Sequence, residues 1–162
     1  MTVGRFINTS TILQQVKIGV TLVHPNTSTT ANRRAVKITC TEGKAQSISI
    51  YHNGGTGNLI LAIYSNVTDA PGSRLAISLS TPINATAGWQ KLNLTSLLPV
   101  TEGQIVWLAW VFQTNPGIRY NASATQRAES TSLWAGGMPE EFGAVGWAAY
   151  EYSSYITILT TI

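Results

Sequence analysis

The stretch that decides the fold is SISIYHNGGTGNLILA, which runs from Ser47 to Ala62. In its first half Ile48 and Ile50 alternate with serine, and alternation at a period of two predicts a β-strand with one buried face. A second apolar run follows a segment rich in glycine and asparagine, which tolerate positive φ. The sequence therefore predicts a hairpin, in which residues 53–58 form the turn between two paired strands.

The same period of two recurs along almost the whole chain, in short apolar runs separated by clusters of Gly, Pro, Asn, Ser and Thr. Helical periodicity is nearly absent. This pattern is typical of all-β proteins, and about ten strands require two layers, so we expect a two-layer antiparallel β-sandwich. The predicted strands are residues 11–23, 33–41, 44–52, 59–65, 74–80, 89–94, 104–113, 117–122, 131–135 and 148–160.

The chain is long enough for one domain with one core. It has 162 residues, of which 44% are hydrophobic and 10% are charged, and a chain of this length buries roughly 70% of its unfolded surface. The polar stretch HPNTSTTAN covers residues 24–32. We expect residues 1–32 to form an extended N-terminal strand and a polar connection that can detach, and residues 33–162 to form the β-sandwich.

The first predicted strand begins at Thr11 and ends at Val23, and one of its faces is strongly apolar. Such a face has to be covered. The strand either packs in its own sandwich or adds to the sheet edge of a neighbouring subunit, which would give self-association. Both alternatives remain open at this stage.

The charge pattern favours neither nucleic acid nor a membrane as partner. The net charge of +3 comes from ten Lys and Arg residues that are scattered singly except at Arg33-Arg34, whereas nucleic-acid proteins usually concentrate their charge on one face. No stretch approaches 18 apolar residues, and residues 1–10 lack a basic start followed by an apolar run. We therefore expect no membrane span and no signal peptide in this sequence.

Residues that commonly carry catalysis or bind metals are few. The seven carboxylates lie mostly in turns and loops, where solubility explains them better than the facing pair of acids that glycoside hydrolysis needs. His24 and His52 have no ligand partner at metal-binding spacing. His52 shares a face with Ile48, so we expect it either to cap the edge of the core or to bond to the backbone of the turn, and we expect the lone Cys40 to be buried. The sequence predicts a protein that is not an enzyme.

Aromatic residues are the feature that most suggests a binding role. Trp107 and Trp110 lie in the run IVWLAWVF, which is apolar on both faces and predicts a buried central strand. The other three tryptophans, Trp89, Trp134 and Trp147, are predicted to face outward or to lie beside glycine-rich loops. Flat rings pack against the C–H face of sugars while amides and guanidinium groups bond to sugar hydroxyls, so these residues predict a glycan surface.

A series of motifs in a fixed order carries a resemblance to a known group of domains. The motifs are RRA from residue 33, QSISIYHNGGTG from 46, AIYS from 62, APGSRL from 70, GWQ from 88, VWLAW from 106, NPGIRY from 115 and GMP from 137. Together they span residues 33–160, and the chain resembles jelly-roll-like β-sandwich accessory domains of secreted and surface bacterial proteins, many of them similar to carbohydrate-binding modules. The resemblance implies an extracellular or cell-surface location and a non-catalytic role without a cofactor. Jelly rolls commonly carry a structural Ca²⁺ ion, for which this chain, with seven Asp and Glu residues, offers few oxygen ligands.

The function predicted from the sequence is binding of a polysaccharide or surface glycan. The expected ligand-binding residues are Trp89, Trp134, Trp147, Tyr120, Arg119, Gln90 and Asn115. The alternative, from another class, is a self-assembling extracellular filament or shell subunit that uses its N-terminal strand for sheet addition. A hydrolase or lyase is a third possibility.

Overall fold

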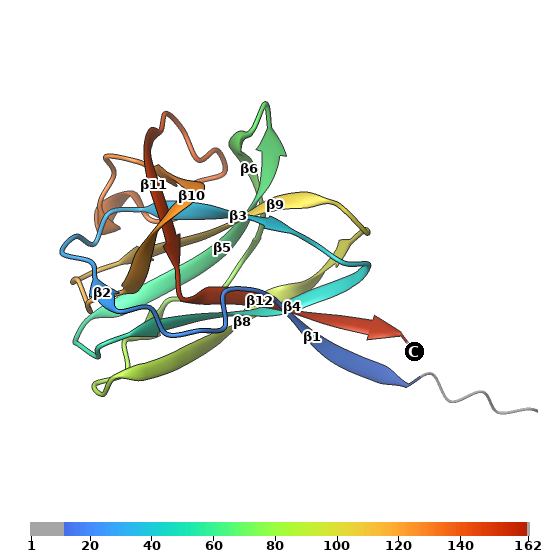
Figure 1. The fold of residues 1–162 in the computed structure, drawn as a ribbon, viewed down its shortest axis with the longest axis horizontal. Helices are drawn as coiled ribbons and strands as arrows, with labels where there is room; N and C mark the ends of the chain where they lie inside the picture. The colour runs from blue at the N-terminus through green and yellow to red at the C-terminus, as the bar shows by residue number, and fades with distance from the viewer. Residues whose placement is uncertain (1–11, 162) are drawn as a thin grey trace, which may run out of the picture.

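The computed structural model describes residues 12–161 and confirms an all-β sandwich (Figure 1). The described part of the chain has twelve strands and one 3₁₀ helix. The smaller sheet has four antiparallel strands in the order β1 (Leu13–Gly19), β12 (Ser154–Thr161), β4 (Gly43–His52) and β8 (Gly88–Val100).

The larger sheet has eight strands. Six follow one another in the order β11 (Gly146–Tyr152), β10 (Arg119–Glu129), β3 (Arg34–Thr39), β9 (Ile105–Phe112), β5 (Asn58–Val67) and β6 (Ala70–Ile77). The two short strands are β2 (Asn26–Thr27), which pairs with β10, and β7 (Thr81–Pro82), which pairs with β5.

The main core lies between the two sheets. Ile48 and Ile50 of β4 and Leu59 and Leu61 of β5 are fully buried in it, together with Trp110 of β9. Alternation sends these side chains inward from both layers, and burial of each large aliphatic side chain contributes about 1.5–3 kcal/mol. The prediction of a buried central strand with at least one core tryptophan is confirmed, since β9 lies between β3 and β5 and both Trp107 and Trp110 are buried.

The predicted hairpin between β4 and β5 is wrong, because these strands belong to different sheets. β4 pairs with β12 and β8, whereas β5 pairs with β9, β6 and β7. The apolar sides of β4 and β5 face the same core from opposite layers, so the glycine-rich segment crosses between the sheets instead of closing a turn. Its backbone bonds go to other loops: Asn53 N–H donates to Pro116 O (2.9 Å) and Gly55 N–H to Asn84 O (3.1 Å).

Two other predicted strands differ from the structure. Residues 131–135 do not form a strand, because they belong to a loop with a 3₁₀ helix at Trp134–Gly136. This loop packs on the outer face of the larger sheet through Met138 and Phe142. The predicted strand 148–160 is two strands, β11 and β12, and the chain changes sheet at Ser153 between them.

The first predicted strand is shorter than expected and belongs to the sheet of its own chain. β1 pairs with β12 along its whole length, from Leu13 opposite Thr161 to Gly19 opposite Tyr155. Thr11, the first residue of the predicted strand, lies outside the described residues. The C-terminal end of the predicted strand, Val23, is exposed and follows β1 without joining the sheet.

Candidate functional site

The seven residues predicted to bind a glycan lie at four places in the fold. Trp147 and Trp134 lie at the outer face of the larger sheet, and Trp89 lies on the outer face of the smaller sheet. Tyr120, Arg119 and Asn115 lie at or near the start of β10, and Gln90 lies inside the molecule. The structure therefore does not bring all seven together into one site.

Trp147 is the most exposed of the predicted aromatic residues and lines an open hollow. Its side chain is 44% exposed, and its ring centroid lies 5.8 Å from that of Trp107, with 53° between the ring planes. The hollow has a volume of about 850 Å³. Besides the two tryptophans it is lined by Lys37, Thr39, Thr68, Asp69, Ala124, Thr125 and Gln126.

The floor of this hollow is built by neighbouring strands of the larger sheet. Lys37 of β3 is the register partner of Trp107 of β9, so both side chains rise from the same row. The indole N–H of Trp107 donates to Asn66 Oδ1 at 2.8 Å. The Lys37 Nζ atom lies 5.8 Å from the Trp107 ring centroid, which is close enough for a cation–π contact.

An ion pair closes one side of the hollow. The two-residue turn between β5 and β6 has positive φ at Thr68 and Asp69, of 46° and 63°, as a tight hairpin requires. This turn brings the Asp69 carboxylate within 2.6 Å of Lys37 Nζ. The hollow thus places a flat exposed ring beside a charged donor, a charged acceptor and an amide, which together can hold a polyhydroxylated ligand.

Trp134 is half-buried and packs against the second hydrophobic cluster, which includes Met138 and Phe142. Arg33 holds its loop in place. This guanidinium is 4% exposed and donates to Gly137 O, Ser130 Oγ and Phe142 O at 3.2, 3.0 and 2.8 Å. Trp134 therefore contributes to the packing of the loop over the sheet.

Tyr120, Arg119 and Asn115 attach the polar connection to the sandwich. The Tyr120 ring lies 5.0 Å from Tyr150, Arg119 Nη1 donates to Pro25 O at 2.9 Å, and Asn115 Nδ2 donates to Ser28 O at 2.8 Å. The side chains of Arg119 and Asn115 are thus engaged with segment 25–28 of the same chain, and the ring of Tyr120 packs on β11.

Gln90 is 4% exposed and its amide is fully engaged, so it does not reach the surface. Its Oε1 atom accepts from Asn84 N–H (3.0 Å) and lies 2.8 Å from His52 Nε2, while its Nε2 donates to Pro82 O (2.8 Å). His52 Nδ1 accepts from Gly54 N–H at 3.0 Å, which confirms the predicted bond between His52 and the backbone of the turn. Burial lowers the pKa of His52, and the bond to Gln90 opposes this effect.

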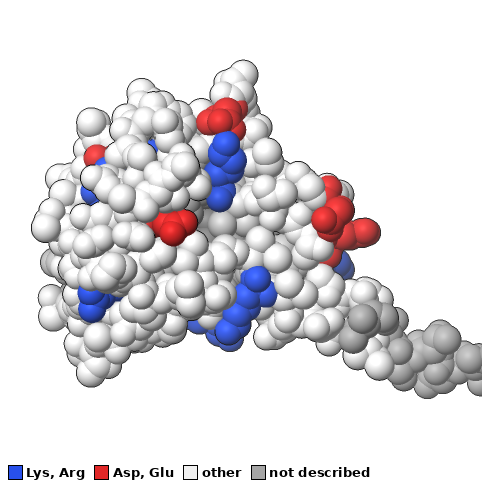
Figure 2. All heavy atoms as spheres, in the orientation of Figure 1, with Lys and Arg blue, Asp and Glu red and all other residues white. Residues whose placement is uncertain are grey.

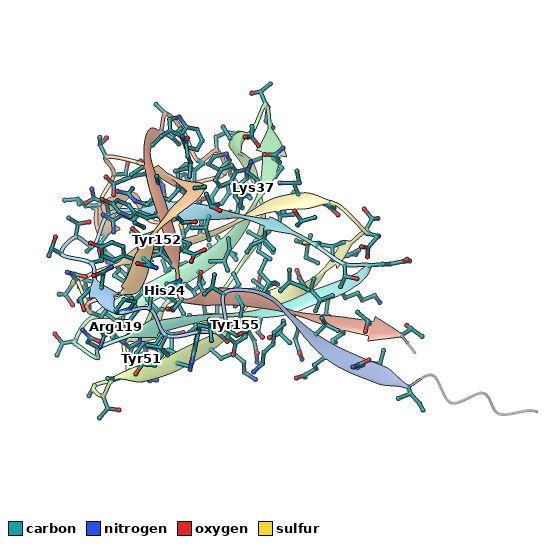
Figure 3. The ribbon with its side chains drawn as sticks, viewed as in Figure 1. His24, Lys37, Tyr51, Arg119, Tyr152 and Tyr155 are labelled. Carbon is teal, nitrogen blue, oxygen red and sulfur yellow. The ribbon has the colours of Figure 1, made fainter. Side chains whose placement is uncertain are left out.

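Trp89 faces outward on the smaller sheet, next to two tyrosines. Its ring centroid lies 4.9 Å from that of Tyr155 and 5.6 Å from that of Tyr51. The ring is half-buried by these neighbours. Figure 3 shows Tyr51 and Tyr155 over the smaller sheet and Lys37 on the other side of the molecule, so the Trp89 cluster and the Trp147 hollow lie on opposite faces.

Of the residues that line the hollow, sequence reasoning found Trp147 and missed the other eight, which include Trp107, Lys37, Asp69 and Gln126. The position of Lys37 between Val36 and Ile38 did mark it as outward-facing. No local pattern joins it to Asp69, which lies 32 positions away and is brought near by the pairing of other strands.

No protein-family model matches this chain, and no curated protein sequence is significantly similar to it. Within residues 12–161 no helix is long and apolar enough to cross a membrane. In the same part of the chain no three side chains of His, Cys, Asp or Glu come together.

Proposed function

We propose that this chain is a non-catalytic carbohydrate-binding module of an extracellular or cell-surface protein. The observation that carries the proposal is the hollow in which the exposed ring of Trp147 lies next to Trp107 and the Lys37–Asp69 ion pair. A sugar ring would stack on Trp147, and its hydroxyls would bond to Lys37, Asp69 and Gln126.

The residues that line the hollow support a neutral or weakly polar glycan there. Lys37 and Asp69 neutralise each other at 2.6 Å, and the remaining polar groups are hydroxyls and an amide. The hollow is open to solvent over the sheet, as a site for an internal segment of a long polymer has to be. The extracellular location rests on the resemblance to accessory domains of secreted proteins.

Depletion assays on insoluble polysaccharides test the proposal. The protein is mixed with a panel that includes cellulose, chitin, xylan and β-glucan, and the unbound fraction is measured. Trp147→Ala should weaken binding at least about tenfold, equivalent to about 1.4 kcal/mol. The matched control is Leu79→Ala, since Leu79 is 72% exposed and is not among the residues that line the hollow.

Two results would contradict the glycan proposal. One is that no polysaccharide of the panel depletes the protein. The other is that Trp147→Ala and Leu79→Ala bind as tightly as the wild type, because the stacking ring would then contribute nothing.

The second candidate function is a self-assembling filament or shell subunit. Among the described residues, β1 is the outermost strand of its sheet and pairs with β12 alone, and Ile12 and Leu13 at its start are each 61% exposed. An edge strand of this kind can exchange between copies. Deletion of residues 1–24 should convert such a polymer to monomers in light scattering, and a wild-type protein that is monomeric at high concentration would exclude this function.

A further inference from the structure

The outer face of the four-stranded sheet has a regular arrangement of side chains. Strand register places Gly19, Tyr155, Ser49 and Lys91 in one row across β1, β12, β4 and β8. The row on one side contains Lys17, Thr157, Ser47 and Asn93, and the row on the other side contains Tyr51 and Trp89. Successive rows on one face are about 7 Å apart. The middle of this face is buried, and the part that solvent reaches is formed by Lys17, Lys91, Asn93 and the half-buried rings of Trp89 and Tyr51.

Aromatic rings and an ammonium group are in direct contact on this surface. Trp89 packs between Tyr51 and Tyr155, as described above, and Lys17 Nζ lies 5.0 Å from the Tyr155 ring centroid. Lys91 lies two positions after Trp89 on the same strand and is exposed. The aromatic rings and the positively charged ammonium groups therefore lie within the span of one or two sugar units.

The charge on this sheet has one sign. The strands β1, β4, β8 and β12 contain Lys17, Lys44 and Lys91 and no Asp or Glu. All three lysines are exposed, and in the part of the chain that the structure describes none forms a salt bridge. Figure 2 shows basic side chains along the lower part of the molecule and acidic side chains gathered at its right-hand end.

We infer that the outer face of the four-stranded sheet, with Trp89, Tyr51, Lys17 and Lys91, is a second binding surface and takes an acidic polysaccharide. The inference rests on the proposed function in taking a glycan as the ligand class. The rings of Trp89 and Tyr51 would stack on sugar C–H faces, while the two ammonium groups pair with carboxylate or sulfate groups along the polymer. Unpaired lysines on a face without acids provide the charge complementarity.

The chemistry of this face favours a polysaccharide over a nucleic acid. The face has lysines and no arginine, although arginine is the usual residue for bidentate contacts to phosphates and bases. Its rings pack against one another at interplanar angles of 86° and 52°. They do not form the series of separate platforms on which successive bases stack.

The test compares acidic polysaccharides with an uncharged match. Affinity electrophoresis is run in gels that contain polygalacturonate, alginate, hyaluronate or chondroitin sulfate. Highly methyl-esterified pectin is the control for polygalacturonate, because esterification removes most of the negative charge of the polymer. At least one acidic polymer should retard the protein, the esterified polymer should not, and added NaCl should abolish the effect. The double variant Lys17→Gln, Lys91→Gln should bind at least tenfold more weakly.

A charge-matched control separates a local site from net charge. The variant Thr131→Glu, Ala144→Glu lowers the net charge by the same two units, but its new acids lie at exposed positions of the loop on the other sheet. The affinity of this control variant for the acidic polymer should stay within about twofold of that of the wild type. Trp89→Ala should weaken acidic binding, and Trp147→Ala should leave it unchanged.

The outcomes distinguish this inference from the proposed function. If none of the four acidic polymers binds, or if the lysine variant and its charge-matched control lose affinity equally, the inference is wrong even where Trp147 still binds a neutral glycan. Equal competition by polyglutamate or oligo(dT) would also overturn it, in favour of unspecific polyanion or nucleic-acid binding. If the protein binds no neutral glycan but still binds an acidic polymer through Lys17 and Lys91, the proposed function is contradicted and this inference is not.

Discussion

The Nε2 atom of His52 lies 2.8 Å from Oε1 of Gln90, inside the sandwich and between two neighbouring strands of the smaller sheet. His52 is 0% exposed and Gln90 is 4% exposed. Because His52 Nδ1 accepts from Gly54 N–H, its Nε2 carries the proton and donates to Gln90. One neutral imidazole thus joins β4, β8 and the loop that crosses between the sheets.

Acid should destabilise the protein through His52. Burial lowers the pKa of His52 below its ordinary value of 6.5, so the unfolded chain takes up a proton at a pH where the folded one does not. The stability that neutral His52 contributes is complete above about pH 6.5 and falls as the pH is lowered through and below that value. Urea denaturation at several pH values between pH 8 and pH 5 measures this fall in the free energy of unfolding. In a His52→Gln variant the free energy of unfolding should fall less over this range, and parallel curves would contradict the prediction.

Cys40 should resist thiol reagents in the folded protein. Its side chain is 2% exposed, and burial raises the pKa of the thiol to about 11. At pH 8 the reactive thiolate is then about 0.1% of the population. Ellman's reagent should modify the native protein at least about a hundredfold more slowly than the protein in guanidinium chloride. Equal rates would show that the segment that follows β3, where Cys40 lies, opens readily.

Arg33→Met should loosen the loop that covers the larger sheet. Methionine keeps much of the apolar stem of arginine but leaves Ser130 Oγ and the carbonyls of Gly137 and Phe142 without their donor. Bonds from a charged group contribute about 1.5–3 kcal/mol each, and removal of the buried charge offsets part of their loss. We therefore expect a net loss of about 2–4 kcal/mol in the free energy of unfolding. Chymotrypsin should then cleave near Trp134 under native conditions. The control Thr131→Ala should be stable, and an uncleaved Arg33→Met variant would contradict the role given to Arg33.

Gly54→Ala should destabilise the crossing between the sheets more than an equivalent change elsewhere. Gly54 has φ of +90°, and a Cβ atom would lie 2.4 Å from Ala85 O. Gly143 has a similar φ of +87° and no atom within 4 Å of such a Cβ. Gly143→Ala therefore loses about 1 kcal/mol from backbone strain alone, and Gly54→Ala should lose at least about 1 kcal/mol more. Thermal unfolding of the two variants makes the comparison, and equal losses would mean that the loop shifts without cost.

Period-two alternation was sufficient to predict most strands, the antiparallel sandwich, and the buried positions of Trp107, Trp110 and Cys40. These features depend on which face of a strand is apolar, and that is written in neighbouring residues. The same reasoning failed for the hairpin between β4 and β5, because alternation shows which side chains point inward but not which layer a strand joins.

The candidate site was predicted in part. An outward Trp89 and a loop-adjacent Trp147 followed from local pattern and glycine content. Gln90 and Asn115 have surface-type side chains that nonetheless bond within the fold, and their partners, Pro82 and Ser28, could be identified only from coordinates.

The amino-acid order alone determined that this chain is β throughout, which faces of most strands are apolar, and that its aromatic content exceeds what one core strand needs. The tertiary structure alone decided which strands are neighbours. That choice placed Trp147 beside Trp107 and Lys37 beside Asp69, and it collected three lysines on one acid-free sheet. The physical reason is that strand pairing is long-range: backbone hydrogen bonds are the same for every residue, so the partner of each strand is selected by how all the apolar faces can be buried at once.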